Sequence, residues 1–319
     1  MTNSDQARLT NNKIFLSGSA GTGKTTIAVD RLRSLIDSGI SGNSILVLAP
    51  QRSLLKPYQQ LLRRADLPAG EQIEALTIGG LARRSIDLMW PLVAPTGKFT
   101  RPDQPPTFLT VETAQYYMQK VVEPLRAEKL FFDGVRVPGQ RLYSQLLDNL
   151  NKAALVGFPY TEIGKRLISA WEGPAAQTMT FAQVQDCIQR FRDYCLANNL
   201  LDFSLQIELF AGLSKTAGFR DRLFKKYRHL IADNTEEDTP ITHDLLRDWI
   251  PAADSALIIF DNEAGYRSFL GADPRSAYKL RSVCDRSIDM TCDSVISIVR
   301  SHTDWSLYAD RGSAPKNDR

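Results

Sequence analysis

Two short apolar runs near the start of the chain flank a glycine-rich loop. Residues 13–17 (KIFLS) form a run that stops at glycine, and residues 44–49 (SILVLA) form a second run that Pro50 ends. Between them, residues 26–38 carry apolar side chains at helical spacing. The pattern predicts a strand, a loop, a helix and a second strand, which is the unit from which parallel sheets are built.

The same kinds of pattern return further along the chain. Helical spacing covers residues 54–65, and residues 72–77 (QIEALT) are typical of a third strand. Two more apolar runs, 228–233 (RHLIAD) and 256–261 (ALIIFD), both end in aspartate. Buried parallel strands often end this way where their C-terminal tips reach a functional site. The sequence therefore predicts an α/β fold with a parallel sheet flanked by helices.

The middle of the chain has a different character. Residues 91–107 contain five prolines, which interrupt both strands and long helices, so we expect a boundary near residue 100. From 111 to 198 the pattern is mostly helical, with turn signals between the helices. The expected parts are a first piece of the sheet domain (1–100), a helical inserted subdomain (101–199), a second piece of the sheet domain (200–300) and a flexible tail (301–319).

The loop at residues 18–25 (GSAGTGKT) matches G-x-x-x-x-G-K-[ST] at every fixed position. Its glycines allow backbone N–H groups to converge on phosphate oxygens, and the next helix adds the partial positive charge of its N-terminus. We expect Lys24 to neutralise phosphate charge and Thr25 to offer a hydroxyl to Mg²⁺. The sequence thus predicts a site for ATP and Mg²⁺. Its expected nucleotide-binding residues are Gly18, Ser19, Ala20, Gly21, Thr22, Gly23, Lys24, Thr25 and Thr26.

A Mg²⁺ site of this kind also needs a carboxylate at the tip of a neighbouring strand. Asp233 is the better candidate, and Asp261 is the other. The alternative interpretation of either residue is an ordinary aspartate in the turn after a strand.

Composition limits the classes of function. The chain has 319 residues, of which 43% are hydrophobic, so it is long enough for two compact units. A net charge of +3 permits contact with nucleic acid without arguing for it. None of the four cysteines belongs to a CxxC pair, which predicts no zinc or iron–sulfur centre and suits a reducing compartment. No apolar run is long enough for a membrane span, so a cytoplasmic protein is expected.

Several segments, in the same order along the chain, resemble the N-terminal ATP-binding half of UvrD/Rep-type superfamily 1 DNA helicases. The glycine-rich loop alone is shared by many ATPases, whereas two acidic segments at the family's spacing are more specific. Those two segments are YRHLIADNTEEDTPITHDLL and LIIFDNEAGYRSFLGAD, the second of which keeps the ending S-F-x-G-A-D. The full set of similar segments comprises residues 16–32, 45–55, 74–84, 200–210, 227–246 and 257–273.

The resemblance implies a RecA-like P-loop domain that contacts single-stranded DNA. It assigns Arg52 and Thr77 to DNA-contacting segments, where an arginine can bind phosphate with two hydrogen bonds. It assigns Tyr266 and Phe269 to a segment that stacks bases, although Phe269 is equally typical of a core residue. It also implies that Gln6 reads the adenine, and a polar tail without a role is the alternative there.

The chain departs from the family pattern where hydrolysis is concerned. The family's catalytic glutamate is replaced by Asn234, and an amide cannot accept a proton from the attacking water. Glu236 and Glu237 are the candidates to replace it. The glutamine that senses the last phosphate in the family is Ala264 here. Nucleotide binding is therefore better supported than fast hydrolysis.

Three hypotheses for function follow. The leading one is an ATP-dependent DNA helicase or DNA-stimulated ATP hydrolase in repair or recombination, in which Lys24, Thr25 and Asp233 hold the nucleotide and Mg²⁺. Because the chain ends before a second RecA-like domain, we expect that domain or a partner subunit to complete the motor. The alternative is a helicase-like scaffold subunit that assists a separate nuclease or motor. The third is an unrelated small-molecule kinase, which would show no ATPase response to DNA.

Overall fold

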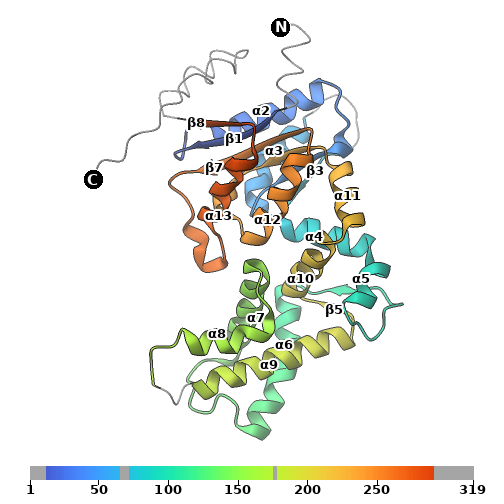
Figure 1. Ribbon diagram of the computed structural model, residues 1–319. Helices are drawn as coiled ribbons and strands as arrows, with labels where there is room; N and C mark the ends of the chain where they lie inside the picture. The colour runs from blue at the N-terminus through green and yellow to red at the C-terminus, as the bar shows by residue number, and fades with distance from the viewer. Residues whose placement is uncertain (1–11, 65–71, 175–177, 291–319) are drawn as a thin grey trace, which may run out of the picture. The chain divides into compact units, whose positions relative to one another are not determined.

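The computed structural model describes residues 12–64, 72–174 and 178–290. The chain forms two compact units (Figure 1). The first contains the described residues up to Ile78 and from Asp221 onward, and the second is Gly79–Arg220. These units divide the chain before the expected boundary at residue 100 and after the one at residue 200.

The first unit is built on a six-stranded sheet with strand order β3-β2-β6-β7-β1-β8. Every neighbouring pair of strands is parallel. The predicted fold class, a parallel sheet flanked by helices as in RecA-like P-loop domains, is confirmed. The strands are β1 (Lys13–Gly18), β2 (Ile45–Leu48), β3 (Glu74–Leu76), β6 (His229–Ala232), β7 (Ser255–Asp261) and β8 (Arg286–Met290).

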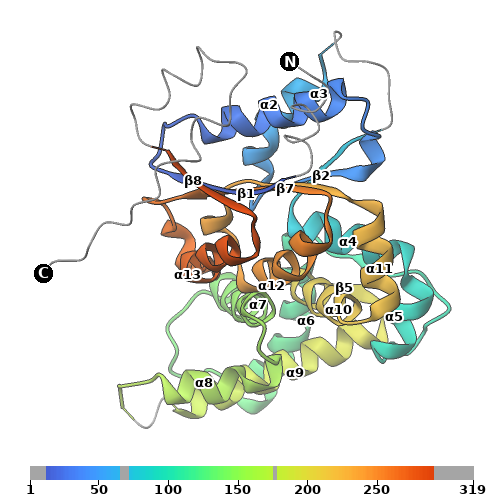
Figure 2. The same cartoon turned by 45° about the horizontal axis from the view of Figure 1, so that its top comes forward.

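Helices cover both faces of this sheet. Figure 2 shows α2 (Lys24–Asp37) and α3 (Lys56–Leu62) on one face and α12 (Pro240–Trp249) and α13 (Pro274–Tyr278) on the other. A short 3₁₀ turn, η2 (Arg52–Leu55), connects β2 to α3. Because helices cover both faces of the sheet, β2, β6 and β7 are buried at every position. Buried parallel strands of this kind have continuous apolar runs in the sequence.

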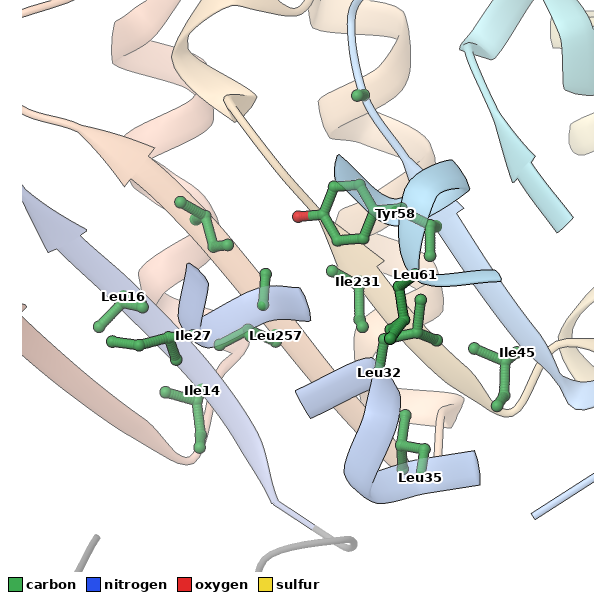
Figure 3. Close-up of a cluster of buried hydrophobic side chains, with 14 of the residues drawn as sticks. Ile14, Leu16, Ile27, Leu32, Leu35, Ile45, Tyr58, Leu61, Ile231 and Leu257 are labelled. Atoms are coloured by element: carbon green, nitrogen blue, oxygen red, sulfur yellow. The ribbon is translucent and has the colours of Figure 1, made fainter. Parts of the chain in front are cut away.

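The core beneath α2 and α3 brings together segments that are far apart in the sequence. Buried side chains of α2, including Ile27, Leu32 and Leu35, pack with Tyr58 and Leu61 of α3 (Figure 3). The strands supply alternate residues to this face, because successive side chains of a strand point to opposite sides. These residues are Ile14, Leu16, Ile45, Val47, Ala49, Ile231, Leu257, Ile259 and Met290.

Aromatic side chains fill much of the opposite face. Phe15 of β1 and Phe260 of β7 contact each other and the ring of Tyr278 from α13, with ring centroids 5.4 to 5.8 Å apart. Trp249 at the end of α12 is fully buried against the ring of Tyr227. These contacts fix α12 and α13 beneath the strands whose ends carry the acidic residues.

The second unit is mostly helical, as the pattern from 111 to 198 predicts. A pair of short parallel strands, β4 (Thr107–Phe108) and β5 (Leu200–Leu201), joins its two ends. The helices are α4 (Ile78–Leu88), α5 (Trp90–Thr96), α6 (Val111–Lys129), α7 (Gly139–Val156), α8 (Ile163–Ser169), α9 (Thr178–Ala197) and α10 (Phe203–Ser214), and α11 (Ala217–Lys226) crosses into the first unit.

A buried arginine connects α9 to α10 in this unit. The Arg192 guanidinium lies 3.1 Å from the Asp202 carboxylate and 2.8 Å from that of Glu208, and it donates a hydrogen bond to Ser204. Asp202 also caps the N-terminus of α10 by accepting backbone N–H groups. A buried charge needs partners of this kind, so the segment 200–210 has a structural role within the second unit.

Candidate nucleotide-binding site

Three neighbouring strands of the first unit end at one edge of the sheet, and each end carries residues of the predicted site. The glycine-rich loop follows β1, Asp233 follows β6, and Asp261 ends β7. The order β6-β7-β1 places these three strands side by side, and Gly18 lies opposite Asp261 in the register. The parallel sheet therefore gathers the loop and both acidic candidates at its carboxyl edge.

The loop has a backbone that only glycine adopts easily. Gly21 and Gly23 have φ angles of 79° and 87°, in the left-handed region. A side chain on Gly18 would place its Cβ 2.7 Å from the carbonyl oxygen of Met290 in β8. Gly23 leads directly into the 14-residue helix α2, whose N-terminus has no side-chain cap. The first N–H groups of α2 are thus available to an anion.

Lys24 is held over this loop. Its ammonium donates hydrogen bonds to the carbonyl oxygens of Gly18 (2.7 Å) and Ser19 (2.6 Å) and lies 3.2 Å from a carboxylate oxygen of Asp261. Only 7% of Lys24 is exposed. A buried ammonium with one carboxylate partner is positioned to neutralise phosphate charge at the loop.

Other residues of the glycine-rich loop and of the first turn of α2 lie close to Lys24 in the sequence. Thr22 is buried and donates a hydrogen bond from its hydroxyl to the Ser19 carbonyl oxygen at 2.8 Å. The Ser19 hydroxyl donates to the Glu263 carboxylate at 2.9 Å, which adds an acidic group beside the loop. Ala20 and Thr26 are exposed at the loop and the first turn of α2.

Asp233 is the acid that meets the loop's hydroxyl. Its Oδ2 accepts a hydrogen bond from Thr25 at 3.1 Å and another from the Tyr58 hydroxyl at 2.7 Å, and its Oδ1 accepts the backbone N–H of Asn234. Burial raises the pKa of Asp233, and the hydrogen bonds from Tyr58 and Thr25 oppose that rise. Asp261 is instead paired with Lys24, so of the two candidate acids it is Asp233 that contacts the Thr25 hydroxyl.

These residues fit Mg²⁺ and a nucleotide. A hydroxyl oxygen from Thr25 and a carboxylate oxygen from Asp233 lie side by side, and Mg²⁺ prefers hard oxygen donors of this type together with phosphate oxygens. The glycine-rich loop, the ammonium of Lys24 and the start of α2 lie at the same edge and suit a phosphate chain.

The segment after Asp233 turns sharply. Asn234 has φ 56° and ψ 44°, a left-handed conformation that asparagine tolerates better than most residues. It precedes the 3₁₀ turn η5 (Thr235–Glu237). Its side-chain amide donates to Glu236 at 3.4 Å. The position where the family has its catalytic glutamate is thus occupied by a turn-forming amide.

Glu236 and Glu237, the candidates to replace the catalytic glutamate, already accept hydrogen bonds from backbone N–H groups. Glu236 is fully buried and accepts the backbone N–H of Asp261 at 2.9 Å. Burial raises the pKa of Glu236 to about 7. Glu237 accepts three backbone N–H groups, from Gly265 (2.9 Å), Tyr266 (3.1 Å) and Arg267 (3.2 Å). A role of either residue as a base stays a prediction. Glu236 joins η5 to β7, and Glu237 joins η5 to the loop after β7.

The residues predicted to contact DNA also follow strands of this sheet. Arg52 is exposed in η2 after β2, and Thr77 is partly buried directly after β3. Tyr266 and Phe269 belong to the 3₁₀ segment η7 (Tyr266–Leu270) after β7 and are 81% and 71% exposed. The interpretation of Phe269 as a core residue is therefore wrong. Gln6 lies outside the described residues.

Tyr58 is the site residue that sequence reasoning missed. It lies in α3 among apolar neighbours, where a tyrosine is typical of an ordinary core position. Its polar hydroxyl was the only local signal, because a buried hydroxyl needs a hydrogen-bond partner.

Across the described parts of the chain, no helix combines the length and the apolar character that crossing a bilayer requires.

Comparisons with known proteins give a distant match to helicases. No protein-family model matches the chain. The ATP-dependent DNA helicase UvrD2 of Mycobacterium tuberculosis and that of Mycobacterium bovis are each 22% identical to it over 264 residues, which cover 80% of this chain and 35% of theirs. The chain thus spans about a third of the length of these relatives.

A shorter match concerns a different kind of helicase protein. One subunit of the ATP-dependent helicase/deoxyribonuclease of Natranaerobius thermophilus is 27% identical over 73 residues, which cover 23% of this chain and 6% of that protein. Together with the parallel sheet and its glycine-rich loop, these similarities support a relationship between this chain and the UvrD-like helicases.

Proposed function

We propose that the first unit is the ATP-binding domain of a UvrD-like DNA helicase or DNA-dependent ATPase that acts in DNA repair or recombination. The observation that carries the proposal is the glycine-rich loop with Thr25 and Asp233 in contact at 3.1 Å beside the buried ammonium of Lys24. The distant similarity to UvrD2, whose name describes an ATP-dependent DNA helicase, supports the same assignment.

Each residue has a role in this proposal. The loop amides and the start of α2 bind phosphate oxygens, and Lys24 exchanges its carbonyl partners for phosphate. Thr25 and Asp233 hold Mg²⁺, which when bound neutralises charge on the phosphates. Glu236 and Glu237 are the remaining candidates for proton acceptance, although their present hydrogen bonds would have to change first.

DNA binding is the second half of the proposal. The exposed rings of Tyr266 and Phe269 offer faces for stacking bases, and Arg52 offers a guanidinium for backbone phosphate. Since η7 begins shortly after the end of β7 and is bound by Glu237 of η5, changes at the nucleotide can reach the DNA-binding loop through a short path. The proposed partners are single-stranded DNA and a second RecA-like domain or a partner subunit.

A catalytically weak scaffold subunit is the second candidate. Asn234 and Ala264 replace residues that the helicase family uses in hydrolysis, and both glutamates near them are engaged by backbone N–H groups. The similarity to a protein whose name describes a subunit of a helicase/deoxyribonuclease supports a role beside a separate nuclease or motor. In this form the domain binds nucleotide or DNA without fast turnover.

The test measures ATP binding and ATP hydrolysis by the purified chain, with and without single-stranded DNA. Lys24→Ala should weaken Mg-ATP binding about tenfold to hundredfold, the size expected when hydrogen bonds to a charged partner are lost. Lys13→Ala is the matched control, because Lys13 lies at the other end of β1 and donates to the Pro251 carbonyl.

The outcomes separate the two candidates. DNA-stimulated hydrolysis that Lys24→Ala abolishes supports the helicase-type ATPase. Tight Mg-ATP binding without turnover, in the presence or absence of DNA, supports the scaffold. Absence of any nucleotide binding by the unaltered chain contradicts the helicase-type ATPase, and absence of both nucleotide binding and DNA binding contradicts the scaffold as well.

A further inference from the structure

The core between the sheet and α3 contains one hydroxyl that reaches the candidate metal site. Tyr58 is fully buried, and its ring packs among apolar residues such as Leu61 and Ile231. Figure 3 shows the ring within this cluster with its oxygen at one end. The hydroxyl donates to Oδ2 of Asp233 at 2.7 Å.

Three donors from three elements orient the Asp233 carboxylate. Thr25 of α2 and Tyr58 of α3 donate to the same oxygen, and the backbone N–H of Asn234 donates to the other. The terminal torsion of an aspartate is broad, so packing alone does not determine the direction of its oxygens. Donors on both oxygens restrict that torsion and keep Oδ2 facing the Thr25 hydroxyl.

Packing of the aromatic ring in the core does not by itself explain why residue Tyr58 carries a hydroxyl. Phenylalanine would occupy the same apolar space, and a buried hydroxyl costs free energy unless it is hydrogen-bonded. The hydroxyl of Tyr58 therefore contributes at Asp233 rather than in the surrounding core. A second buried tyrosine in the same unit, Tyr227, donates instead to the Glu74 carboxylate on β3, a different carboxylate from that of the candidate site.

We propose that Tyr58 is a positioning residue of the Mg²⁺ site, whose hydroxyl holds Asp233 in the orientation that lets Asp233 and Thr25 bind the metal together. This inference rests on the proposed function, since it takes Asp233 as the metal-binding acid. It adds α3 to the elements that build the site, because the Tyr58 hydroxyl contacts the carboxylate that is proposed to bind Mg²⁺.

The experiment titrates Mg²⁺ against binding of a fluorescent ATP analogue to the full chain. In Tyr58→Phe, the Mg²⁺ concentration for half-maximal binding should rise about tenfold, as expected for one lost hydrogen bond to a charged acceptor. Binding of the analogue in EDTA should not change. Tyr227→Phe is the matched control, because it removes a buried tyrosine–carboxylate bond elsewhere and should leave the Mg²⁺ dependence as it is.

Each outcome decides between specific explanations. An unchanged Mg²⁺ dependence in Tyr58→Phe overturns the inference while the proposed function stands. Equal weakening with and without Mg²⁺ also overturns it, because that result indicates general distortion of the core. If the unaltered chain binds no nucleotide in Mg²⁺, the proposed function fails and the inference fails with it. Near-ultraviolet circular dichroism and thermal unfolding in EDTA confirm that both variants fold.

Discussion

The two sides of the candidate site use their polar groups in different ways. On the loop between β1 and α2, the glycines, Lys24 and the helix N-terminus offer groups that a phosphate chain can take over. At the ends of β6 and β7, Glu236 and Glu237 accept hydrogen bonds from the backbone of neighbouring segments. In the proposed function the loop groups are available to a ligand, whereas the carboxylates of Glu236 and Glu237 are engaged in joining neighbouring segments of the protein.

Under the proposed function, this difference assigns nucleotide binding and nucleotide hydrolysis to separable parts of one sheet edge. The loop keeps every fixed position of its motif, whereas the two departures that concern hydrolysis, Asn234 and Ala264, lie in the region after β6 and β7. Experiments on the second region therefore break or sharpen the comparison most directly.

The largest effect is expected from the buried acid Glu236, whose pKa burial raises from 4.5 to about 7. A raised pKa in the folded state gives stability that is present below pH 4.5 and is lost as pH rises toward 7. Glu236→Gln removes this loss, so above pH 7 it should exceed the unaltered chain in unfolding free energy by up to about 3 kcal/mol. An amide oxygen can still accept the Asp261 N–H.

Urea unfolding at several pH values between 4 and 8 checks this prediction. The difference between the two proteins should be small at pH 4 and should grow up to about pH 7. Parallel stability curves across this range would show that Glu236 does not titrate in it. Glu263→Gln is the control, because Glu263 is exposed.

The next effect concerns the exposed rings of η7. Tyr266→Ala and Phe269→Ala should each weaken binding of single-stranded DNA by about 1–3 kcal/mol, the range for loss of one base–aromatic stack. Thermal stability should change little, since both side chains are largely exposed. Fluorescence anisotropy with a labelled oligonucleotide measures the affinity.

The variant Arg52→Ala, which removes a charge at the same edge of the sheet, is the control for the two ring variants. Arg52→Ala should reduce the dependence of DNA affinity on salt by about one ion, whereas the ring variants should leave that slope unchanged. Normal DNA affinity in both ring variants would refute the assignment of η7 to DNA.

The smallest effect tests the position of the missing glutamate. Asn234→Glu should lower the free energy of unfolding by about 1–2 kcal/mol, because the residue has a left-handed backbone that glutamate adopts poorly. It should not restore fast ATP hydrolysis. Asn234→Gly, which suits the same backbone, should retain stability to within a few tenths of a kcal/mol. A stable Asn234→Glu variant with rapid ATP turnover would instead show that the side chain at position 234 alone accounts for slow hydrolysis.

The sheet was largely predictable, including the edge strand β3, but its other edge was not. Buried apolar runs mark β1, β2, β6 and β7 because each is covered on both faces. The edge strand β8 (Arg286–Met290) was missed, since it carries exposed polar side chains and lacks such a run. The proline-rich stretch suggested a boundary near residue 100, yet Pro91 lies in the first turn of α5 and Pro95 within it, so the helix tolerates both.

The sequence by itself determined the glycine-rich loop, the acids at the strand ends and the asparagine at position 234, because these features are local and have a fixed spacing. Only the tertiary structure decided which acid meets Thr25, which one pairs with Lys24, and that Tyr58 and Glu237 support the site. Those contacts join residues from 28 to 237 positions apart. They arise from the order of the strands and the packing of α3, and no local pattern of residues encodes that arrangement.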